Sequence, residues 1–184
     1  TNALLTMTDG VLSGKTGFTG DAGYCYVCAC EKDEKTFVVS LLGCGWPNNK
    51  GYKWKDSVKL LDYGEDNFDY EKFWKELKFP EVPVKDGVEK NSTFGDTAVV
   101  SGIPSVSEKE KNKKILMKKG EKISCRLEMP EKLQAPVKKG NRIGTLIYSL
   151  GEEELASYPV LADRNVEKVS YGWCVDQVFH DFFH

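Results

Sequence analysis

Residues 9–44 decide the fold of the first part of the chain, and they read DGVLSGKTGFTGDAGYCYVCACEKDEKTFVVSLLGC. Two apolar runs, at 24–30 and 36–44, are separated by the charged segment 31–35. Two such runs joined by a short polar turn predict an antiparallel β-hairpin. Neither run alternates cleanly between apolar and polar residues, so we expect both faces of this hairpin to be buried beneath helices.

The segment that follows the hairpin predicts one helix. Trp54, Val58 and Leu61 are spaced at i, i+4 and i+7 and form a single apolar stripe, and Gly64 suits the C-terminal cap. One hairpin and one helix cannot cover both faces of a buried sheet. We therefore expect residues 1–69 to be part of a larger domain whose other layers lie outside this sequence.

Residues 70–165 have a different pattern, in which short alternating segments are separated by turn glycines. The stretches 123–127 and 143–150 are the clearest of these segments. The pattern predicts a small all-β sandwich, with 105–114 as a loop. Residues 166–184 return to helical spacing, so the chain as a whole is expected to be of the α+β class.

Composition and charge narrow the class of protein. Hydrophobic residues make up 40% of the 184 residues, which is typical of a globular protein. The formal net charge of −2 disfavours a dedicated nucleic-acid binder. Residues 108–142 nevertheless carry twelve Lys and Arg against five Asp and Glu. We favour a solvated surface for this basic stretch, and the alternative is attraction to an anionic envelope surface.

Neither the cysteines nor the histidines predict a metal site or a disulfide framework. Cys25 and Cys28 form a Cys-x-x-Cys pair with no second pair at zinc-finger spacing, and His180 and His184 have no evident third ligand. We expect buried free thiols instead, because most of the cysteines lie within apolar runs. The six cysteines are Cys25, Cys28, Cys30, Cys44, Cys125 and Cys174.

The tripeptide Lys15-Thr16-Gly17 is a weak match by itself, but here it lies on a predicted strand ahead of Ala22-Gly23-Tyr24-Cys25. In that context it resembles the third active-site motif of the penicillin-binding serine peptidases, specifically the low-molecular-weight D-alanyl-D-alanine carboxypeptidases. The segments 60–64, 133–140 and 143–145 are also similar to that family, in the family's order.

The resemblance implies a division of the chain into three parts. Residues 1–69 would be the terminal hairpin and helix of a β-lactamase/transpeptidase-like catalytic domain. Residues 70–165 would be the family's C-terminal β-sandwich domain. Residues 166–184 would be an amphipathic helix in the position of the family's membrane anchor.

The resemblance also implies roles for four residues. Lys15 and Thr16 would hold the terminal carboxylate of the substrate, and Gly17 would let the backbone approach closely. The backbone N–H of Phe18 would be one donor of the oxyanion hole. The implied enzyme acts on the cell envelope and removes the terminal D-Ala of peptidoglycan stem peptides through an acyl-serine intermediate. It needs no metal or organic cofactor, and β-lactams inhibit it.

The nucleophile of that chemistry is absent from these 184 residues. No serine has a lysine three residues later, and no serine or tyrosine has an asparagine two residues later. We therefore expect the missing N-terminal half of the catalytic domain to supply the serine, and this chain alone to be inactive. Two other functions stay open: a related endopeptidase or β-lactamase, and a non-catalytic envelope module that docks a partner.

The C-terminal segment, residues 171–184, has one aromatic-rich apolar side and no Lys or Arg. One interpretation is a helix that packs on its own domain. The other is an interfacial helix on the outer face of the bacterial cytoplasmic membrane, to which Trp173 and the phenylalanines contribute most of the affinity. The apolar side consists of Tyr171, Cys174, Val175, Val178, Phe179 and Phe182.

Overall fold

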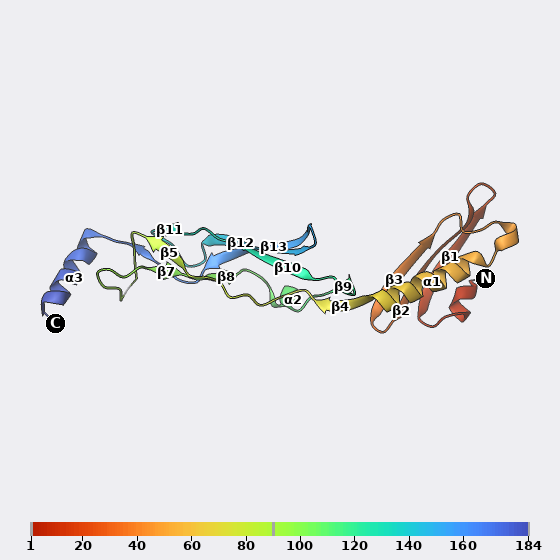
Figure 1. Cartoon of the computed structure of the whole chain (residues 1–184), viewed down its shortest axis with the longest axis horizontal. Coiled ribbons are helices and arrows are strands. Elements are labelled where there is room, and N and C mark those ends of the chain that lie inside the picture. The colour runs from red at the N-terminus through yellow and green to blue at the C-terminus, as the bar shows by residue number, and fades with distance from the viewer. Residues whose placement is uncertain (1, 90, 184) are drawn as a thin grey trace. The chain divides into compact units, whose positions relative to one another are not determined.

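The computed structural model describes residues 2–89 and 91–183 and is mixed α+β, with more strands than helices (Figure 1). It divides into two compact units. Unit 1 is Thr1–Lys72 with Lys114–Glu121, and unit 2 is Phe73–Lys113 with Lys122–His184. The sequence predicts one boundary near residue 69. The structure also joins Lys114–Glu121 to the first unit, because a strand in that segment pairs with the end of the first unit.

Unit 1 is built on a three-stranded antiparallel sheet in the order β1-β2-β3 (Figure 1). A second, two-stranded sheet pairs β4 with β9. The elements of the unit are η1 (Ala3–Thr6), β1 (Val11–Thr19), β2 (Gly23–Lys32), β3 (Lys35–Leu41), η2 (Pro47–Asn49), α1 (Tyr52–Asn67), β4 (Phe68–Lys72) and β9 (Lys114–Lys118).

The turn between β2 and β3 fixes their register. Lys32 pairs with Lys35, so Asp33 and Glu34 form a two-residue loop. Both residues have positive φ, 50° and 61°. These values fit a type I′ turn, whose twist matches that of the flanking strands.

One face of the sheet packs against α1 and η1. Tyr26, Cys28 and Cys30 point from β2 into this core, and Val39 and Leu61 join them from β3 and α1. Because side chains alternate along a strand, the three β2 residues share one face. Burial under α1 is therefore the main source of hydrophobic stabilisation in unit 1.

Gly64 lies inside α1 and not at its end, which corrects the expected C-terminal cap; the helix continues to Asn67. A Cβ atom on Gly64 would lie 2.9 Å from a ring carbon of Phe37. The glycine is thus explained by the close approach of that ring from β3. The C-terminal cap position is taken by Phe68, whose backbone N–H donates to the carbonyl of Gly64.

The opposite face of the sheet is exposed in the part of the chain that the structure describes. Val38 is 71% exposed, Leu42 is 82% exposed, and Val27 is also exposed. The expectation that both faces are covered is therefore not met within these residues, since α1 and η1 pack on one side only.

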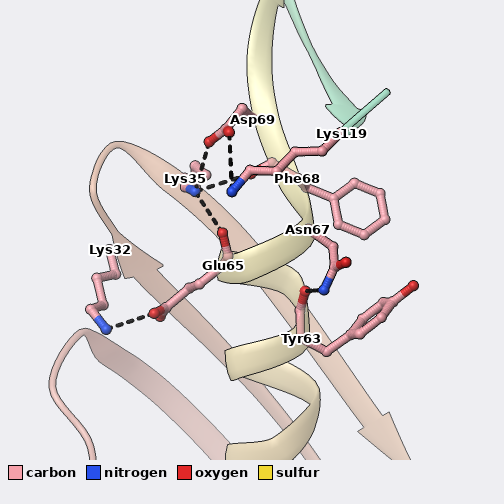
Figure 2. A network of polar contacts seen from close by, with 8 residues as sticks. All are labelled: Lys32, Lys35, Tyr63, Glu65, Asn67, Phe68, Asp69 and Lys119. Carbon is pink, nitrogen blue, oxygen red and sulfur yellow. Dashed lines mark hydrogen bonds and ion pairs between the residues drawn. The ribbon is translucent and has the colours of Figure 1, made fainter. Parts of the chain in front are cut away.

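Lys35 on β3 links the sheet to the C-terminal end of α1 through hydrogen bonds and an ion pair (Figure 2). Its ammonium group donates to the carbonyl oxygens of Glu65 and Phe68, each at 3.0 Å, and pairs with a carboxylate oxygen of Asp69 at 3.1 Å. Carbonyls in the last turn of a helix lack intrahelical donors, so a cation there stabilises the helix end. The hydrogen bond from Lys35, with Lys119 nearby, holds the pKa of Asp69 below its usual range.

Unit 2 contains a four-stranded sheet in the order β10-β12-β13-β8 and a three-stranded sheet in the order β11-β5-β7, consistent with a β-sandwich. The longest strands, β12 and β13, form an antiparallel hairpin (Figure 1). The strands are β5 (Val82–Lys85), β6 (Gly87–Val88), β7 (Val99–Val100), β8 (Gly102–Pro104), β10 (Ile123–Glu128), β11 (Leu133–Gln134), β12 (Arg142–Leu150), β13 (Glu153–Ala162) and β14 (Glu167–Lys168).

Both sheets contribute to the core of unit 2. Val82, Val84 and Val100 are buried on the smaller sheet, and Leu146 and Val160 are fully buried on the larger one. The expected loop at 105–114 contains one helical turn, α2 (Glu108–Lys111). The hydroxyl of its N-cap residue accepts a hydrogen bond from a backbone N–H of the turn, which explains why this polar segment forms a helix.

Helix α3 (Tyr171–Phe183) ends the described chain. Its first turn is capped by Ser170, whose hydroxyl accepts from the N–H of Trp173 at 3.2 Å. The ring of Trp173 packs edge-to-face with Phe94 of the same unit, with centroids 5.3 Å apart. No helix in the described residues is long and apolar enough to span a membrane.

Two adjacent leucines on α1 provide a test of this packing. Leu61 is 2% exposed in the core of unit 1, whereas Leu60 is 46% exposed. We expect Leu61→Ala to lower the free energy of unfolding by about 2–5 kcal/mol through lost burial and a cavity. Leu60→Ala should change it by less than about 0.5 kcal/mol. Urea denaturation followed by circular dichroism measures both, and equal midpoints would contradict the packing described.

Candidate active-site strand

Lys15, Thr16 and Gly17 lie in the middle of β1, which is an edge strand of the described sheet. Their partners on β2 are Val27, Tyr26 and Cys25, respectively. Tyr26 is buried beneath α1, whereas Val27 is exposed. Because cross-strand partners share a face, Lys15 and Gly17 lie on the open face of the sheet and Thr16 lies on the α1 face.

A shallow groove of about 440 Å³ runs along this open face. Its lining includes Lys15, Gly17, Cys25, Val27, Ser40 and Leu42. The groove is largely apolar apart from the lysine. An extended ligand with an anionic end is therefore the kind of molecule that suits it.

The ammonium of Lys15 is available to such a ligand. Lys15 is exposed, and the ion pairs found in the described part of unit 1 involve Lys32, Lys35, Lys59 and Lys119. No carboxylate in that part of the chain neutralises Lys15. An anion entering the groove therefore meets an uncompensated positive charge.

The backbone N–H of Phe18 faces the free edge of the sheet. In antiparallel sheets, successive residues of a strand bond alternately to one neighbour and to the other. The N–H of Tyr24 donates to the carbonyl of Gly45 at 2.8 Å, and its carbonyl accepts from Cys44 at 2.7 Å, both on the β3 side. Tyr24 is the cross-strand partner of Phe18. It follows that the N–H and C=O of Phe18 point away from β2.

The strand thus presents three kinds of group within four residues: an ammonium on the open face, a hydroxyl on the α1 face, and a backbone N–H that points to the free edge and has no partner among the described residues. Such an edge can bind an extended peptide by adding it as a further strand. A backbone N–H at the edge can also stabilise the negative charge that develops on a carbonyl oxygen during acyl transfer.

Three of the four cysteines of unit 1, Cys28, Cys30 and Cys44, do not offer an alternative nucleophile. Cys28 and Cys30 are buried in the core, and burial raises the pKa of both thiols. Burial and a hydrogen bond to Asp56 also raise the pKa of Cys44. A thiol with a raised pKa is a poor nucleophile at neutral pH, because the thiolate is the reactive form.

The histidine pair considered as a metal site is only partly within the described chain. His180 lies on α3, and His184 lies outside the described residues. No group of three or more possible metal ligands occurs among the residues that the structure describes.

Lys53 is a residue of this region that the sequence analysis missed. The buried positions of α1 are Lys53, Ser57, Leu61 and Gly64, one turn apart, while Trp54 and Val58 are only partly buried. Burial lowers the pKa of the Lys53 ammonium. The signal in the sequence is its i, i+4, i+8 spacing with Ser57 and Leu61, which a search for apolar residues alone passes over.

Comparison with known proteins agrees with the C-terminal β-domain expected from the sequence. Residues 85–168 match the family model described as penicillin-binding protein 5, C-terminal domain. The chain is related to the D-alanyl-D-alanine carboxypeptidases. It is 27% identical, over 93% of its length, to D-alanyl-D-alanine carboxypeptidase DacF of Bacillus subtilis (strain 168), and the match covers 41% of that protein.

Solved structures of such carboxypeptidases are also similar. The D-alanyl-D-alanine carboxypeptidase DacD from Francisella tularensis aligns with a TM-score of 0.54 and 26% identity, covering 91% of this chain and 39% of that one. Penicillin binding protein 5 from Haemophilus influenzae aligns at 26% identity over 84% of this chain and 42% of its own, with a TM-score of 0.40. The chain therefore spans about two fifths of the length of the relatives it matches.

Proposed function

We propose that this chain is part of a serine-type D-alanyl-D-alanine carboxypeptidase that removes the terminal D-Ala of peptidoglycan stem peptides through an acyl-serine intermediate. The observation that carries the proposal is the Lys15–Phe18 segment on an edge strand, with an exposed ammonium and an N–H at the free edge, in a chain related to such enzymes. The enzyme acts outside the cytoplasm, where its peptidoglycan substrate lies.

Each residue of the segment has a role in this proposal. The ammonium of Lys15 binds the terminal carboxylate of the stem peptide from the open face, and the hydroxyl of Thr16, which lies on the α1 face, binds it around the free edge of β1. Gly17, which has no atom within 4 Å of a would-be Cβ, leaves room for the peptide to approach the strand. The N–H of Phe18 donates to the carbonyl oxygen that becomes negative when the serine attacks.

The serine itself comes from sequence outside these 184 residues, which contain no Ser-x-x-Lys. The part of the exposed face of the β1-β2-β3 sheet that lies outside the groove is the surface that the rest of the catalytic domain covers. Val38, which is 71% exposed and does not line the groove, supports this assignment, because apolar patches of a catalytic domain are normally buried.

Two other functions are compatible with parts of the chain. A DD-endopeptidase uses the same kind of site and differs in which bond of the peptidoglycan it cleaves. A non-catalytic envelope docking module is favoured by one observation: the family match covers 85–168, which belongs to unit 2 except for Lys114–Glu121, and leaves Lys15 outside it. Product analysis distinguishes the carboxypeptidase, the endopeptidase and the docking module. The full-length protein is given a pentapeptide and a cross-linked dimer, and the products formed from each are identified.

Penicillin labelling tests where the nucleophile lies. We expect the 184-residue chain to form no covalent adduct with penicillin, because it contains no activated serine. The full-length protein should gain the mass of one penicillin per molecule. Intact-protein mass spectrometry measures both. A stoichiometric adduct on any serine of the short chain would overturn the assignment.

Removing the Lys15 charge tests the role of the strand. In the full-length enzyme we expect Lys15→Ala to lower kcat/KM for a D-Ala-D-Ala peptide by about 10²–10³, typical for loss of a positioned polar partner. The matched control is Lys32→Ala, which removes a surface lysine paired with Glu65 at 2.6 Å. Surface ion pairs contribute about 1 kcal/mol or less, so Lys32→Ala should leave the kinetics nearly unchanged. Equal kinetics for the two variants would remove Lys15 from the site.

We propose, second, that α3 attaches the protein to the outer face of the cytoplasmic membrane. Tyr171, Val178, Phe179 and Phe182 are exposed on this helix, and Phe182 is 83% exposed. Trp173 is half-buried against Phe94, so it contributes to docking the helix on unit 2. The aromatic residues of the second half of the helix then supply the apolar contact with lipid.

Vesicle flotation tests the membrane contact. We expect the chain to float with lipid vesicles weakly and nearly independently of salt, because residues 171–184 contain no Lys or Arg. Phe182→Ser should reduce the bound fraction severalfold, since it removes an exposed aromatic ring. The matched control is Leu60→Ser, an exposed apolar residue of α1. If both variants and the native chain stay in the soluble fraction, α3 is a packing element.

A further inference from the structure

The side chain of Phe18 belongs to a stack that crosses from β1 to α1. The rings of Phe18 and Tyr24 lie 4.5 Å apart between centroids. The ammonium of Lys53 lies over the Tyr24 ring, 4.0 Å from its centroid, and 4.7 Å from the centroid of Trp54. Phe18, Tyr24 and Lys53 therefore form a continuous chain of contacts from the edge strand to the helix.

Lys53 is an unusual residue to find in this position. It is 5% exposed, and its ammonium donates to the carbonyl of Lys50 at 2.7 Å. Among the described residues it has no carboxylate partner, unlike Lys32 and Lys35. Burying an ammonium without an anion is unfavourable, and the two aromatic faces compensate part of that cost through cation–π attraction.

The other contacts at this end of the sheet act on the turn and not on Phe18. The hydroxyl of Thr19 accepts from the N–H of Ala22 at 3.1 Å, and the indole N–H of Trp46 donates to the carbonyl of Gly20 at 3.1 Å. The first contact closes the loop between β1 and β2, and the second holds that loop from the segment after β3. Neither contact involves the N–H of Phe18, which points to the free edge although Phe18 itself pairs with Tyr24.

We propose that Tyr24 and Lys53 are positioning residues that hold the backbone N–H of Phe18 in place for acyl transfer. The Tyr24 ring fixes the Phe18 ring, and the Lys53 ammonium fixes the Tyr24 ring against α1. This inference rests on the function proposed above and adds two residues that do not touch the substrate themselves. In this proposal the buried ammonium of Lys53 contributes to the reaction indirectly, by aligning the Phe18 N–H.

The need for such a support follows from the chemistry. An oxyanion donor contributes fully only when it is already aligned with the oxygen that becomes negative. A misplacement of about 1 Å can lower a rate by about 10². The Phe18 N–H points to the free edge and has no ladder partner of its own, although Gly17 and Thr19 on either side pair with β2. Packing of the Phe18 side chain therefore adds to the support that the flanking ladder gives this N–H.

The first test uses this chain. Gly17 pairs with Cys25 next to the stack, so exchange of its amide reports on the order of the strand end. We expect Tyr24→Leu and Lys53→Met to speed this exchange about tenfold, because local opening becomes easier. Tyr24→Phe and Lys53→Arg keep the ring and the charge and should stay close to the native rate. Leu60→Ala controls for an unrelated change on α1.

The second test uses the full-length enzyme and separates positioning from general stability. We expect Tyr24→Leu and Lys53→Met to lower the acylation rate by about tenfold and leave the affinity for the substrate unchanged. Sulfur accepts weaker hydrogen bonds than oxygen, so a thionoester depends less on the Phe18 N–H than the matched ester does. The ester-to-thionoester rate ratio should therefore fall in these two variants. In Leu61→Ala, which is destabilised elsewhere, it should not.

Three results would overturn the inference. The first is an unchanged Gly17 exchange rate in both disruptive variants. The second is a loss of substrate affinity with an unchanged acylation rate, which would make Lys53 a substrate-binding residue. The third is the same ester-to-thionoester ratio in all variants. Absence of acyl transfer in the native full-length protein would instead reject the proposed function, and the exchange experiment would still decide whether the stack orders the strand.

Discussion

The burial of Tyr26 beneath α1 decides the side on which every residue of the candidate strand lies. Tyr26 is 2% exposed, packs edge-to-face on Trp54 with centroids 4.8 Å apart, and donates its hydroxyl to Asn2 at 2.9 Å. Its cross-strand partner is Thr16. A slip of one residue in this pairing would turn Lys15 toward the core and Tyr26 away from it, which is unfavourable because a charge is buried and an aromatic ring is exposed.

Residues near Tyr26 fit its packing beneath α1. A Cβ atom on Gly14 would overlap the Tyr26 hydroxyl, so the glycine before Lys15 is explained by the tyrosine that it faces. Lys35 acts at the other end of the helix and ties its last turn to the sheet (Figure 2). The helix is thereby held against the sheet at both ends, and the face of the edge strand that carries Lys15 is kept open.

The local features of this fold could be predicted from the sequence, and the long-range ones could not. Two apolar runs around a short charged turn predict the hairpin, because strand pairing across a two-residue loop is local. The pairing of β4 with β9 joins segments more than forty residues apart, and neither segment carries a signal for the other. Gly64 is a second example of a long-range feature. A glycine near the end of a helix predicts a C-terminal cap, but the reason for this glycine is the close approach of the Phe37 ring, which the sequence around Gly64 does not reveal.

In the candidate site, too, some features could be predicted from the sequence and others depend on long-range contacts. The resemblance of Lys15, Thr16 and Gly17 to the family's motif implied a substrate-binding strand, but the directions of these side chains depend on which β2 residue faces each of them. The two lysines illustrate the difference. Lys15 is exposed and has no ion-pair partner among the described residues, so its charge can act on a ligand. Lys53 is buried against aromatic rings, so its charge acts within the protein. In the roles proposed above, the same functional group contributes binding in one position and alignment of the strand in the other, and the difference comes from the environment of each lysine.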